Sequence, residues 1–350
     1  MKRILIADDS PTARTLLRHL LESQPDFQVV GVAGDGIEAV RLACSLRPDV
    51  ATMDLAMPNL DGFEATRRIM QTCPIPIVVV SSLVSPTERS EAIRAMQAGA
   101  VAALPRPPGP GTPGAERLAR ELVDTIRTLS RVKVIQRRIL RRTPEPTRMI
   151  DPKQRVVPRN RVQIVVVGAS TGGPHALAAI LAALRPDFSI PILVVQHITP
   201  GFVPGLRDWL DNVCPLQVVV PADGQPIRQG FVYLAPDETQ MGVSSLGRIA
   251  LDAGNRSDLH RPSVGHLFRS AHTAFGPAVA AVLLTGMGHD GAEELVCMDR
   301  AGAPTVLQDR ATSTVWGMPG EAARLGARSL RLPLDEIGTW LNALRLLQPA

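Results

Sequence analysis

The sequence predicts an α/β protein built of two doubly wound domains, each a parallel sheet with helices on both faces. Apolar runs alternate with segments of helical spacing in two separate series, which is typical of parallel strands joined by helical crossovers. The runs are continuously apolar, as expected of strands buried on both faces. At 350 residues, the chain also exceeds what one hydrophobic core usually supports. We expect domains at residues 1–108 and 159–350, joined by a helical and basic linker at 109–158.

The first series begins with an apolar strand and a helix for which Ser10 is a suitable N-cap and Pro11 a suitable first residue. Proline and glycine break regular structure from Pro105 to Gly114. One long helix is then expected over residues 115–142, with the rest of the connector running to residue 160. The predicted strands of this series are RILIA (3–7), FQVVGVA (27–33), DVATMD (49–54), PIVVVSS (76–82) and GAVAALPRP (99–107).

The second series begins at Val162 and needs about 190 residues, the size of one large domain. Helical segments separate several of its apolar runs, so a second parallel sheet is expected. Its predicted strands are VQIVVVGAS (162–170), IPILVVQH (190–197), LQVVV (216–220), FVYLAP (231–236) and the run that opens AVAAVLLTGMGHD (278–290).

Charge is concentrated in the connector. Residues 131–161 hold eleven Lys/Arg and two Asp/Glu, a local net charge of +9, so the other 319 residues sum to −4. A solvated linker is the expected interpretation, and a nucleic-acid or membrane-surface patch is the alternative. Aromatic residues make up only 3%, which argues against a stacking platform for single-stranded nucleic acid.

The four cysteines, Cys44, Cys73, Cys214 and Cys297, are widely spaced and form no C-x-x-C pair. This excludes a zinc ribbon and argues against a disulfide scaffold, so buried thiols in a reducing compartment are expected. Two aspartates interrupt the first apolar run too early for a signal peptide. No apolar stretch reaches 18 residues, so no membrane insertion is expected. We therefore expect a cytoplasmic protein.

Carboxylates follow two predicted strands of the first domain. Asp8 and Asp9 follow the first strand, Asp54 follows the third, and Ser81 lies at the end of the fourth. These positions converge at the carboxyl edge of a parallel sheet, where open α/β folds bind ligands. Oxygen ligands of this kind suit Mg²⁺. A carboxylate beside the ion is a candidate nucleophile toward phosphorus, forming an acyl phosphate to which Ser81 could hydrogen-bond.

The second domain places Ser170 in a glycine-rich turn between a strand and a helix, where helix N-terminal amides could hold an oxyanion. A dinucleotide loop is disfavoured, because GASTGG lacks the G-x-G-x-x-G spacing and the next strand ends in His197 rather than an acid. Asp290 follows a later strand and a glycine-rich loop. The order Ser170, His197, Asp290 differs from the Ser, acid, His order of α/β-hydrolases. It fits a nucleophile, a base and an orienting acid, with His289 as an alternative base.

IADDSP, MDLAMPNLDG, VVSS and GAVAALPRP resemble the response-regulator receiver domain across residues 1–108. The resemblance implies a flavodoxin-like fold with Asp54 as phospho-acceptor, Asp8, Asp9 and Asp54 around Mg²⁺, and Ser81 as the hydroxyl partner of the phosphoryl group. Arg106 stands where the family has lysine, and Ala103 stands where an aromatic switch residue is common.

GASTGGP, VVQH, YLAP, HRPSV and TGMGHDGA resemble the protein-glutamate methylesterase family of bacterial chemotaxis, the CheB family, whose catalytic domain is Rossmann-like. The resemblance implies a serine hydrolase that demethylates glutamate γ-methyl esters on chemoreceptors, releases methanol and also deamidates receptor glutamines. Ser170, His197 and Asp290 match its nucleophile, base and acid, and Thr171 and Met287 match residues that line its site. Two positions depart from the family pattern, Gly265 where aspartate is usual and Gln240 where histidine is common.

The resemblance also implies partners and control. We expect methylated chemoreceptor cytoplasmic helices as substrate, a chemotaxis histidine kinase as phosphodonor, Mg²⁺ at the receiver, no cofactor in the esterase site, and no nucleic acid. The unphosphorylated receiver is expected to hold the hydrolase in check. The alternatives are a regulator with a vestigial hydrolase site and nucleic-acid binding through the connector, which lacks a recognised DNA-binding motif.

Overall fold

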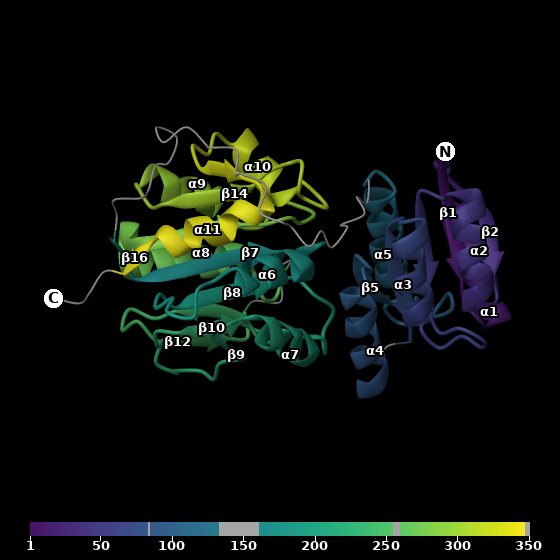
Figure 1. Ribbon diagram of the computed structural model, residues 1–350, viewed down its shortest axis with the longest axis horizontal. Coiled ribbons are helices and arrows are strands. Elements are labelled where there is room, and N and C mark those ends of the chain that lie inside the picture. The colour runs from purple at the N-terminus through teal and green to yellow at the C-terminus, as the bar shows by residue number, and fades with distance from the viewer. Residues whose placement is uncertain (83–84, 133–160, 255–259, 347–350) are drawn as a thin grey trace, which may run out of the picture. The chain divides into compact units, whose positions relative to one another are not determined.

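The protein is described here by a computed structural model that covers residues 1–82, 85–132, 161–254 and 260–346. The chain divides into two compact units, one N-terminal and one C-terminal (Figure 1). Each contains its own parallel sheet with helices on both faces, as the apolar runs predict. None of the helices in the described ranges combines the length and the apolarity that crossing a bilayer requires.

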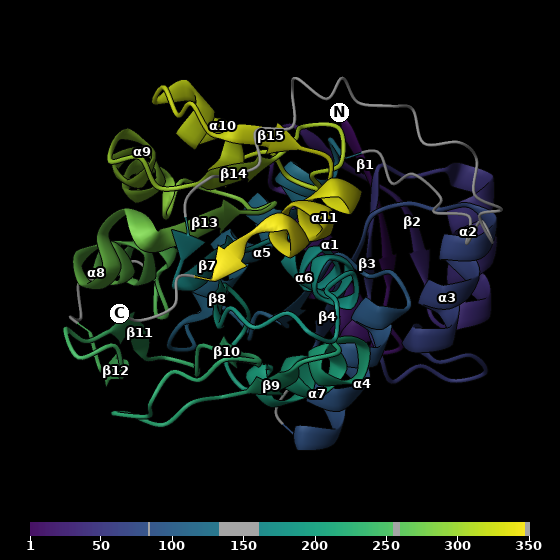
Figure 2. The same ribbon diagram turned by 60° about the vertical axis from the view of Figure 1, so that its left-hand side comes forward.

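The N-terminal unit is a five-stranded parallel sheet in the order β2-β1-β3-β4-β5. Helices α2, α3 and α4 lie side by side on one face, and α1 and α5 lie on the other (Figure 2). The chain leaves β1 in one direction for β2 and later returns to its other side for β3, so a topological switch point lies between β1 and β3. The elements are β1 (Lys2–Ala7), α1 (Pro11–Glu22), β2 (Phe27–Ala33), α2 (Gly36–Leu46), β3 (Val50–Met53), α3 (Gly62–Thr72), β4 (Ile77–Ser81), α4 (Pro86–Gln97), β5 (Ala102–Pro105) and α5 (Ala115–Leu129).

The C-terminal unit is a seven-stranded parallel sheet in the order β15-β14-β13-β7-β8-β10-β9. Its switch point lies between β7 and β13, because the chain builds one half outward from β7 through β8 and the other half outward from β13. Two small sheets flank it, the antiparallel pair β11–β12 and the parallel pair β6–β16.

The strands of this unit are β6 (Arg161–Val162), β7 (Ile164–Ala169), β8 (Ile192–Gln196), β9 (Gln217–Val219), β10 (Phe231–Leu234), β11 (Gln240–Val243), β12 (Ile249–Asp252), β13 (Val279–Leu283), β14 (Thr305–Gln308), β15 (Leu330–Leu332) and β16 (Arg345–Leu346). The helices are α6 (Gly173–Ala182), α7 (Val203–Val213), α8 (Val264–Phe275), the 3₁₀ turn η2 (Gly276–Ala278), α9 (Ala292–Arg300), α10 (Met318–Arg324) and α11 (Leu334–Ala343).

Burial explains the sequence pattern of the central strands. Every residue of β7, β8 and β13 is buried, so neither face of these strands meets solvent, and apart from Gln196 at the end of β8 their residues are apolar or glycine. In α1, Ser10 caps the helix by accepting a hydrogen bond from the Ala13 amide, as predicted.

The prediction of one continuous helix over residues 115–142 is wrong. Helix α5 ends at Leu129, and residues 130 and 131 form a turn. Leu122, Val123, Ile126 and Leu129 make its buried face, and the sequence beyond them turns basic, which favours solvent over packing. The remainder of this prediction, and most of the basic connector, fall outside the described residues.

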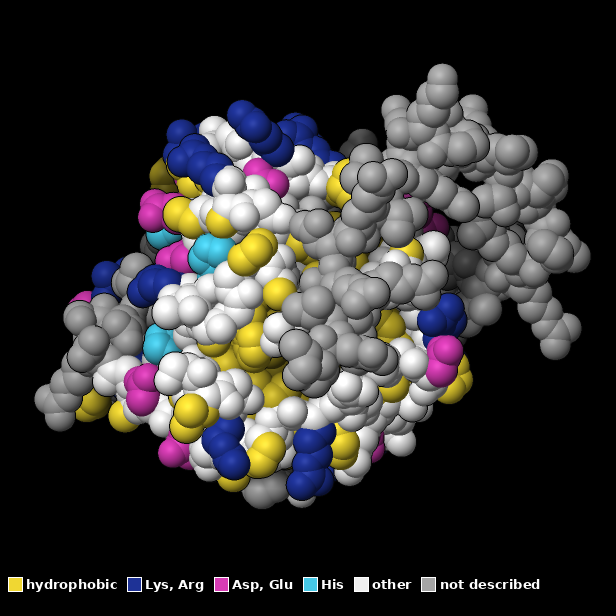
Figure 3. Space-filling view, turned by 90° about the vertical axis from the view of Figure 1, so that its left-hand side faces the viewer, with side chains coloured by type: hydrophobic (Ala, Val, Ile, Leu, Met, Phe, Trp, Pro, Cys, Tyr) yellow, Lys and Arg dark blue, Asp and Glu magenta, His cyan; other side chains and the backbone are white. Residues whose placement is uncertain are grey.

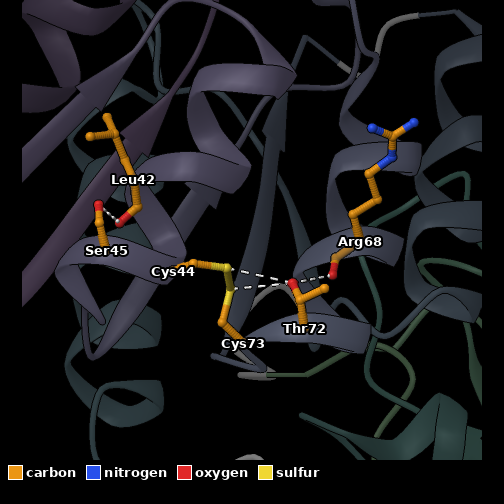
Figure 4. Close-up of a disulfide and its surroundings, with 6 residues drawn as sticks. All are labelled: Leu42, Cys44, Ser45, Arg68, Thr72 and Cys73. Carbon is orange, nitrogen blue, oxygen red and sulfur yellow. Dashed lines mark hydrogen bonds between the residues drawn. A yellow bond between two sulfur atoms is a disulfide. The ribbon is translucent and has the colours of Figure 1, made fainter.

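The expectation of four reduced, buried thiols is also wrong. Cys44 in α2 and Cys73, which follows α3, form a disulfide with a Cα–Cα distance of 5.3 Å (Figure 4). Both residues are half-buried, and the hydroxyl of Thr72 lies 3.5 Å from each sulfur. Of the two free cysteines, Cys214 is half-buried and Cys297 is exposed. The bond links two helices that pack side by side, a proximity that cysteine spacing alone does not reveal.

Candidate functional site

The N-terminal sheet brings Asp8, Asp9 and Asp54 together at its switch point. Asp8 and Asp9 follow β1, and Asp54 follows the neighbouring strand β3. Carboxylate oxygens from the three residues all lie within 4.8 Å of one another. Asp8 and Asp54 are buried and Asp9 is exposed, so the cluster has one side open to solvent.

Arg106, just beyond β5, reaches into this cluster. Its Nη2 lies 2.9 Å from Asp8 Oδ2 and 3.1 Å from Asp54 Oδ1, and its amide donates to the carbonyl of Ser81 at 2.8 Å. One terminal nitrogen of the planar guanidinium therefore bridges two carboxylates.

The carboxylates of this site carry more negative charge than one arginine offsets. Burial raises the pKa of Asp8 to about 6, assisted by the charge of Asp54 and opposed by Arg106. Burial also raises the pKa of Asp54, against the lowering effects of a hydrogen bond with Ser81 and of Arg106. Both groups are thus held in a setting that disfavours their charged forms.

A divalent cation fits this donor set. Asp8 Oδ2 and Asp54 Oδ1 are buried without a hydrogen bond of acceptable geometry, although Arg106 lies at ion-pair distance from both. Buried carboxylate oxygens normally have partners, and hard oxygen ligands around an open position match Mg²⁺.

In the C-terminal unit, Ser170 occupies the tight turn between β7 and α6. Its amide donates to the Thr285 carbonyl at 3.1 Å, and its own carbonyl accepts from the Gly173 amide at 2.7 Å and from Gln196 Nε2 at 2.8 Å. Gly286 lies so close that a Cβ there would come within 2.8 Å of Ser170 Cβ. The strand end and the glycine loop after β13 therefore fix the backbone of the serine.

His197 follows β8 and pairs with Asp290, which lies in the loop after β13. The Nε2 of His197 lies 2.9 Å from Asp290 Oδ2. The two side chains are largely buried and come from strands on either side of β7. Two residues 93 positions apart in sequence thus place an imidazole and a carboxylate at one sheet edge.

Asp290 is further held by the N-terminus of α8. It accepts hydrogen bonds from the Ser263 hydroxyl at 2.9 Å, the Val264 amide at 2.7 Å and the Gly265 amide at 2.9 Å. Burial alone would raise the pKa of Asp290, but the hydrogen bond and charge of His197, together with the Gly265 and Val264 amides, hold it well below its usual range. Asp290 therefore remains a carboxylate that fixes the imidazole.

Ser170 and His197 lie at the ends of neighbouring paired strands without a hydrogen bond between their side chains in the described structure. The amide of His197 donates to the Ala169 carbonyl at 2.9 Å, which sets the two strand ends side by side. Because Asp290 engages Nε2, Nδ1 is the ring nitrogen left to serve Ser170. Catalytic hydrogen bonds of this kind often tighten only when substrate binds.

The remaining predicted residues fall around this edge. Thr171 forms the turn before α6, and its carbonyl accepts from the Thr285 hydroxyl at 3.0 Å. Met287 is 40% exposed and follows Gly286, the residue packed on Ser170. His289 is exposed, and the imidazole on Asp290 is that of His197, so the geometry disfavours His289 as the base.

Sequence reasoning missed the contacts that two residues make around the pair. The ring of His260 stacks on His197, and Gln240 binds the segment that carries His260. Gln240 was noticed only as a departure from a family pattern. Ser263 could have been used to predict part of this arrangement. It is an N-cap residue, and the helix N-terminus that it marks can bind an anion such as the Asp290 carboxylate.

Comparisons with known proteins identify the family of each unit. The family profile "CheB methylesterase" matches residues 165–341, and "Response regulator receiver domain" matches residues 4–112. A Geobacter metallireducens protein named protein-glutamate methylesterase/protein-glutamine glutaminase 4 is 47% identical over 348 residues, covering 99% of each chain. A Myxococcus xanthus protein of the same name is 46% identical over 318 residues, covering 91% of this chain and 90% of its own.

Solved structures give the same correspondence for the C-terminal unit. The crystal structure of the Thermotoga maritima CheB methylesterase catalytic domain is 35% identical, with a TM-score of 0.50, and covers 52% of this chain and 97% of its own.

Proposed function

Because this chain belongs to the CheB methylesterase family, we propose that it demethylates chemoreceptor glutamates through Ser170, His197 and Asp290. It is a protein-glutamate methylesterase and protein-glutamine glutaminase with a receiver domain, and its activity is regulated by phosphorylation. The observation that carries the proposed roles is the His197–Asp290 pair, held at the same sheet edge as Ser170.

The first half of the reaction forms an acyl-enzyme. Ser170 Oγ attacks the γ-carbonyl carbon of a methylated glutamate while His197 Nδ1 takes the hydroxyl proton. The tetrahedral intermediate then collapses, the C–O bond to the methoxy group breaks, and the imidazolium gives its proton to the departing methanol. With a glutamine side chain, the same steps release ammonia.

The second half returns the enzyme to its starting state. Water attacks the ester carbonyl as His197 removes its proton, and the bond to Ser170 Oγ breaks with return of the proton to that oxygen. The product is a glutamate carboxylate. Asp290 stays ionised throughout and stabilises each transient imidazolium by the bond to Nε2.

We assign the oxyanion site to the turns at Thr171 and Met287. Thr171 lies at the N-terminus of α6, where helix amides favour negative charge. Met287 follows Gly286, whose contact with Ser170 brings the second turn beside the nucleophile. Both turns thus border the position where the carbonyl oxygen becomes an anion.

In the receiver, Asp54 accepts a phosphoryl group from the phosphohistidine of a chemotaxis histidine kinase. An oxygen of Asp54 attacks phosphorus and the P–N bond to the kinase histidine breaks. Asp8, Asp9 and Asp54 would hold Mg²⁺, which when bound offsets the charge of the carboxylates and phosphoryl oxygens. Ser81 and Arg106 would hydrogen-bond the phosphoryl oxygens.

As partners we propose a chemotaxis histidine kinase and the cytoplasmic helices of methylated chemoreceptors, and with them a cytoplasmic location. Nucleic acid is not among the proposed partners. On the face of the C-terminal unit drawn in Figure 3, basic and acidic side chains both occur, and a phosphate-binding stripe would need one sign of charge. The basic connector lies mostly outside the described residues.

Methanol release from methylated receptor tests the proposal. We expect release by the full chain, stimulation by a small acyl phosphate, and a loss of at least about 10³-fold in Ser170→Ala. Near-normal release by Ser170→Ala would overturn the serine mechanism. Equal release with and without acyl phosphate would overturn the regulatory role of Asp54.

A further inference from the structure

A second histidine lies flat against the proposed base. The rings of His260 and His197 are stacked, with centroids 4.3 Å apart and planes inclined by 15°. His260 lies in the segment that leads into α8 and is an exposed residue, so the contact with His197 covers one ring face of a side chain that otherwise meets solvent. One face of the His197 ring is therefore covered by another aromatic ring, while its Nε2 is engaged by Asp290.

Gln240, in β11, fixes the segment that carries His260. Its Nε2 donates to the His260 carbonyl at 2.9 Å, and its Oε1 accepts from the Ser263 amide at 2.8 Å. Gln240 is buried, and Ser263 in turn donates its hydroxyl to Asp290. The same short segment thus presents a ring to His197 and a hydrogen bond to the acid that orients it.

We propose that His260 is a positioning residue, whose neutral ring sets the plane of the His197 imidazole and stabilises the imidazolium that forms there during catalysis. This inference rests on the proposed function, since it acts through His197. Stacking restricts rotation of the imidazole about its side-chain bonds, so Nε2 stays on Asp290 while Nδ1 stays directed toward Ser170. A neutral aromatic face also attracts a cation stacked against it.

The charge state of His260 agrees with this role. The ionisable groups that act on it are His197 after β8, and Asp290 and His289 in the loop after β13. Burial lowers the pKa of His260, and His197 lowers it further. Asp290 acts in the opposite direction, and His289 adds to the lowering. The lowered pKa favours the neutral ring when His197 takes up its proton, which avoids two stacked cations.

Methanol release by the full chain, with kcat and KM measured separately, tests the proposal in His260→Phe, His260→Leu and His260→Ala. Phenylalanine keeps the flat stacked ring, whereas leucine fills similar space without one. We expect His260→Phe to keep kcat within about 3-fold, and His260→Leu and His260→Ala to lose about 10-fold or more, with KM little changed in all three. His266→Ala, which alters a histidine of α8 that faces Asp252 in β12, is the matched control and should leave kcat unchanged.

Two outcomes would overturn the role of His260. One is kcat within twofold of the parent in both His260→Leu and His260→Ala. The other is an equal loss in His260→Phe and His260→Leu, because the stacked ring would then not be the operative feature. If His260→Ala fails to fold, the Phe and Leu pair still decides the matter. The ratio of kcat in the parent protein to kcat in Ser170→Ala separates the two failures. A ratio near one would mean that the proposed function itself is wrong, whatever the His260 variants do.

Discussion

Removing the Cys44–Cys73 disulfide should destabilise the N-terminal unit by several kilocalories per mole. The bond closes a loop of 29 residues between α2 and the end of α3. By the chain-entropy relation, a loop of this length contributes about 3.6 kcal/mol at 25 °C. Cys44→Ser with Cys73→Ser, or reduction of the parent protein, should therefore lower the free energy of unfolding of this unit by about that amount.

The two units can be followed separately in one urea titration. All three tryptophans (209, 316 and 340) and the single tyrosine (233) lie in the C-terminal half of the sequence, so intrinsic fluorescence reports the C-terminal unit while circular dichroism reports both. At urea m values of roughly 1–3 kcal/mol/M, the N-terminal transition should move down by about 1 M or more. The fluorescence transition should not move, and Cys297→Ser, at an exposed free cysteine, is the matched control.

The disulfide lies far from the phosphorylation site, so its loss should affect stability without affecting phosphorylation. Cys44 and Cys73 lie at the C-terminal ends of α2 and α3, which in a βαβ fold return to the amino edge of the sheet. Asp54 lies at the opposite, carboxyl edge. Below the unfolding transition, loss of the bond should leave the rate of Asp54 phosphorylation unchanged. The reasoning would be refuted if the N-terminal transition were unaltered in the double variant. It would also be refuted if the purified protein had four alkylatable thiols under denaturing, non-reducing conditions.

Three further predictions concern the two sites. In EDTA, the N-terminal unit should lose stability as the pH rises from 3.8 to above about 6, because native Asp8 keeps a proton that the unfolded chain releases. At 1.36 kcal/mol per pKa unit, the free energy of unfolding should fall by about 3 kcal/mol over this range. Asp8→Asn should flatten this dependence in urea titrations, and an equal slope in both proteins would contradict it. Gly286→Ala should lower kcat for methanol release by about 10-fold or more and also lower the melting temperature, because the added methyl group would meet Ser170 and the buried Met318. Unchanged kcat would show that this contact is unimportant. Asp54→Ala should leave methanol release low whatever acyl phosphate is added, and a parent-like stimulation in this variant would place the regulatory phosphoryl group elsewhere.

Most of the site could be predicted from the sequence, because residues that follow parallel strands meet at the carboxyl edge of the sheet. Ser170, His197 and Asp290 each follow a continuously apolar run, and parallel strands bring such residues to one edge. The same rule brought Asp8 and Asp54 together, because β1 and β3 are adjacent. These positions were predictable because topology, rather than side-chain packing, decides them.

Contacts made by side chains and loops were not predictable in this way. His260 reaches His197 through a segment that Gln240 holds from another strand, and nothing in the local pattern encodes that contact. The disulfide depends on how α2 packs against α3. The end of α5 was misjudged because helical spacing continues in the sequence past Leu129, where the buried face stops.

The central claim is that Ser170 becomes covalently attached to the substrate. Acid quench of the full chain during turnover of a methylated receptor, followed by proteolysis and mass spectrometry, tests it most directly. The account predicts an ester between Ser170 and the γ-carboxyl of the receptor glutamate, formed by the parent and absent from Ser170→Ala. Sustained methanol release by Ser170→Ala, or an acyl group carried by another residue, would contradict it.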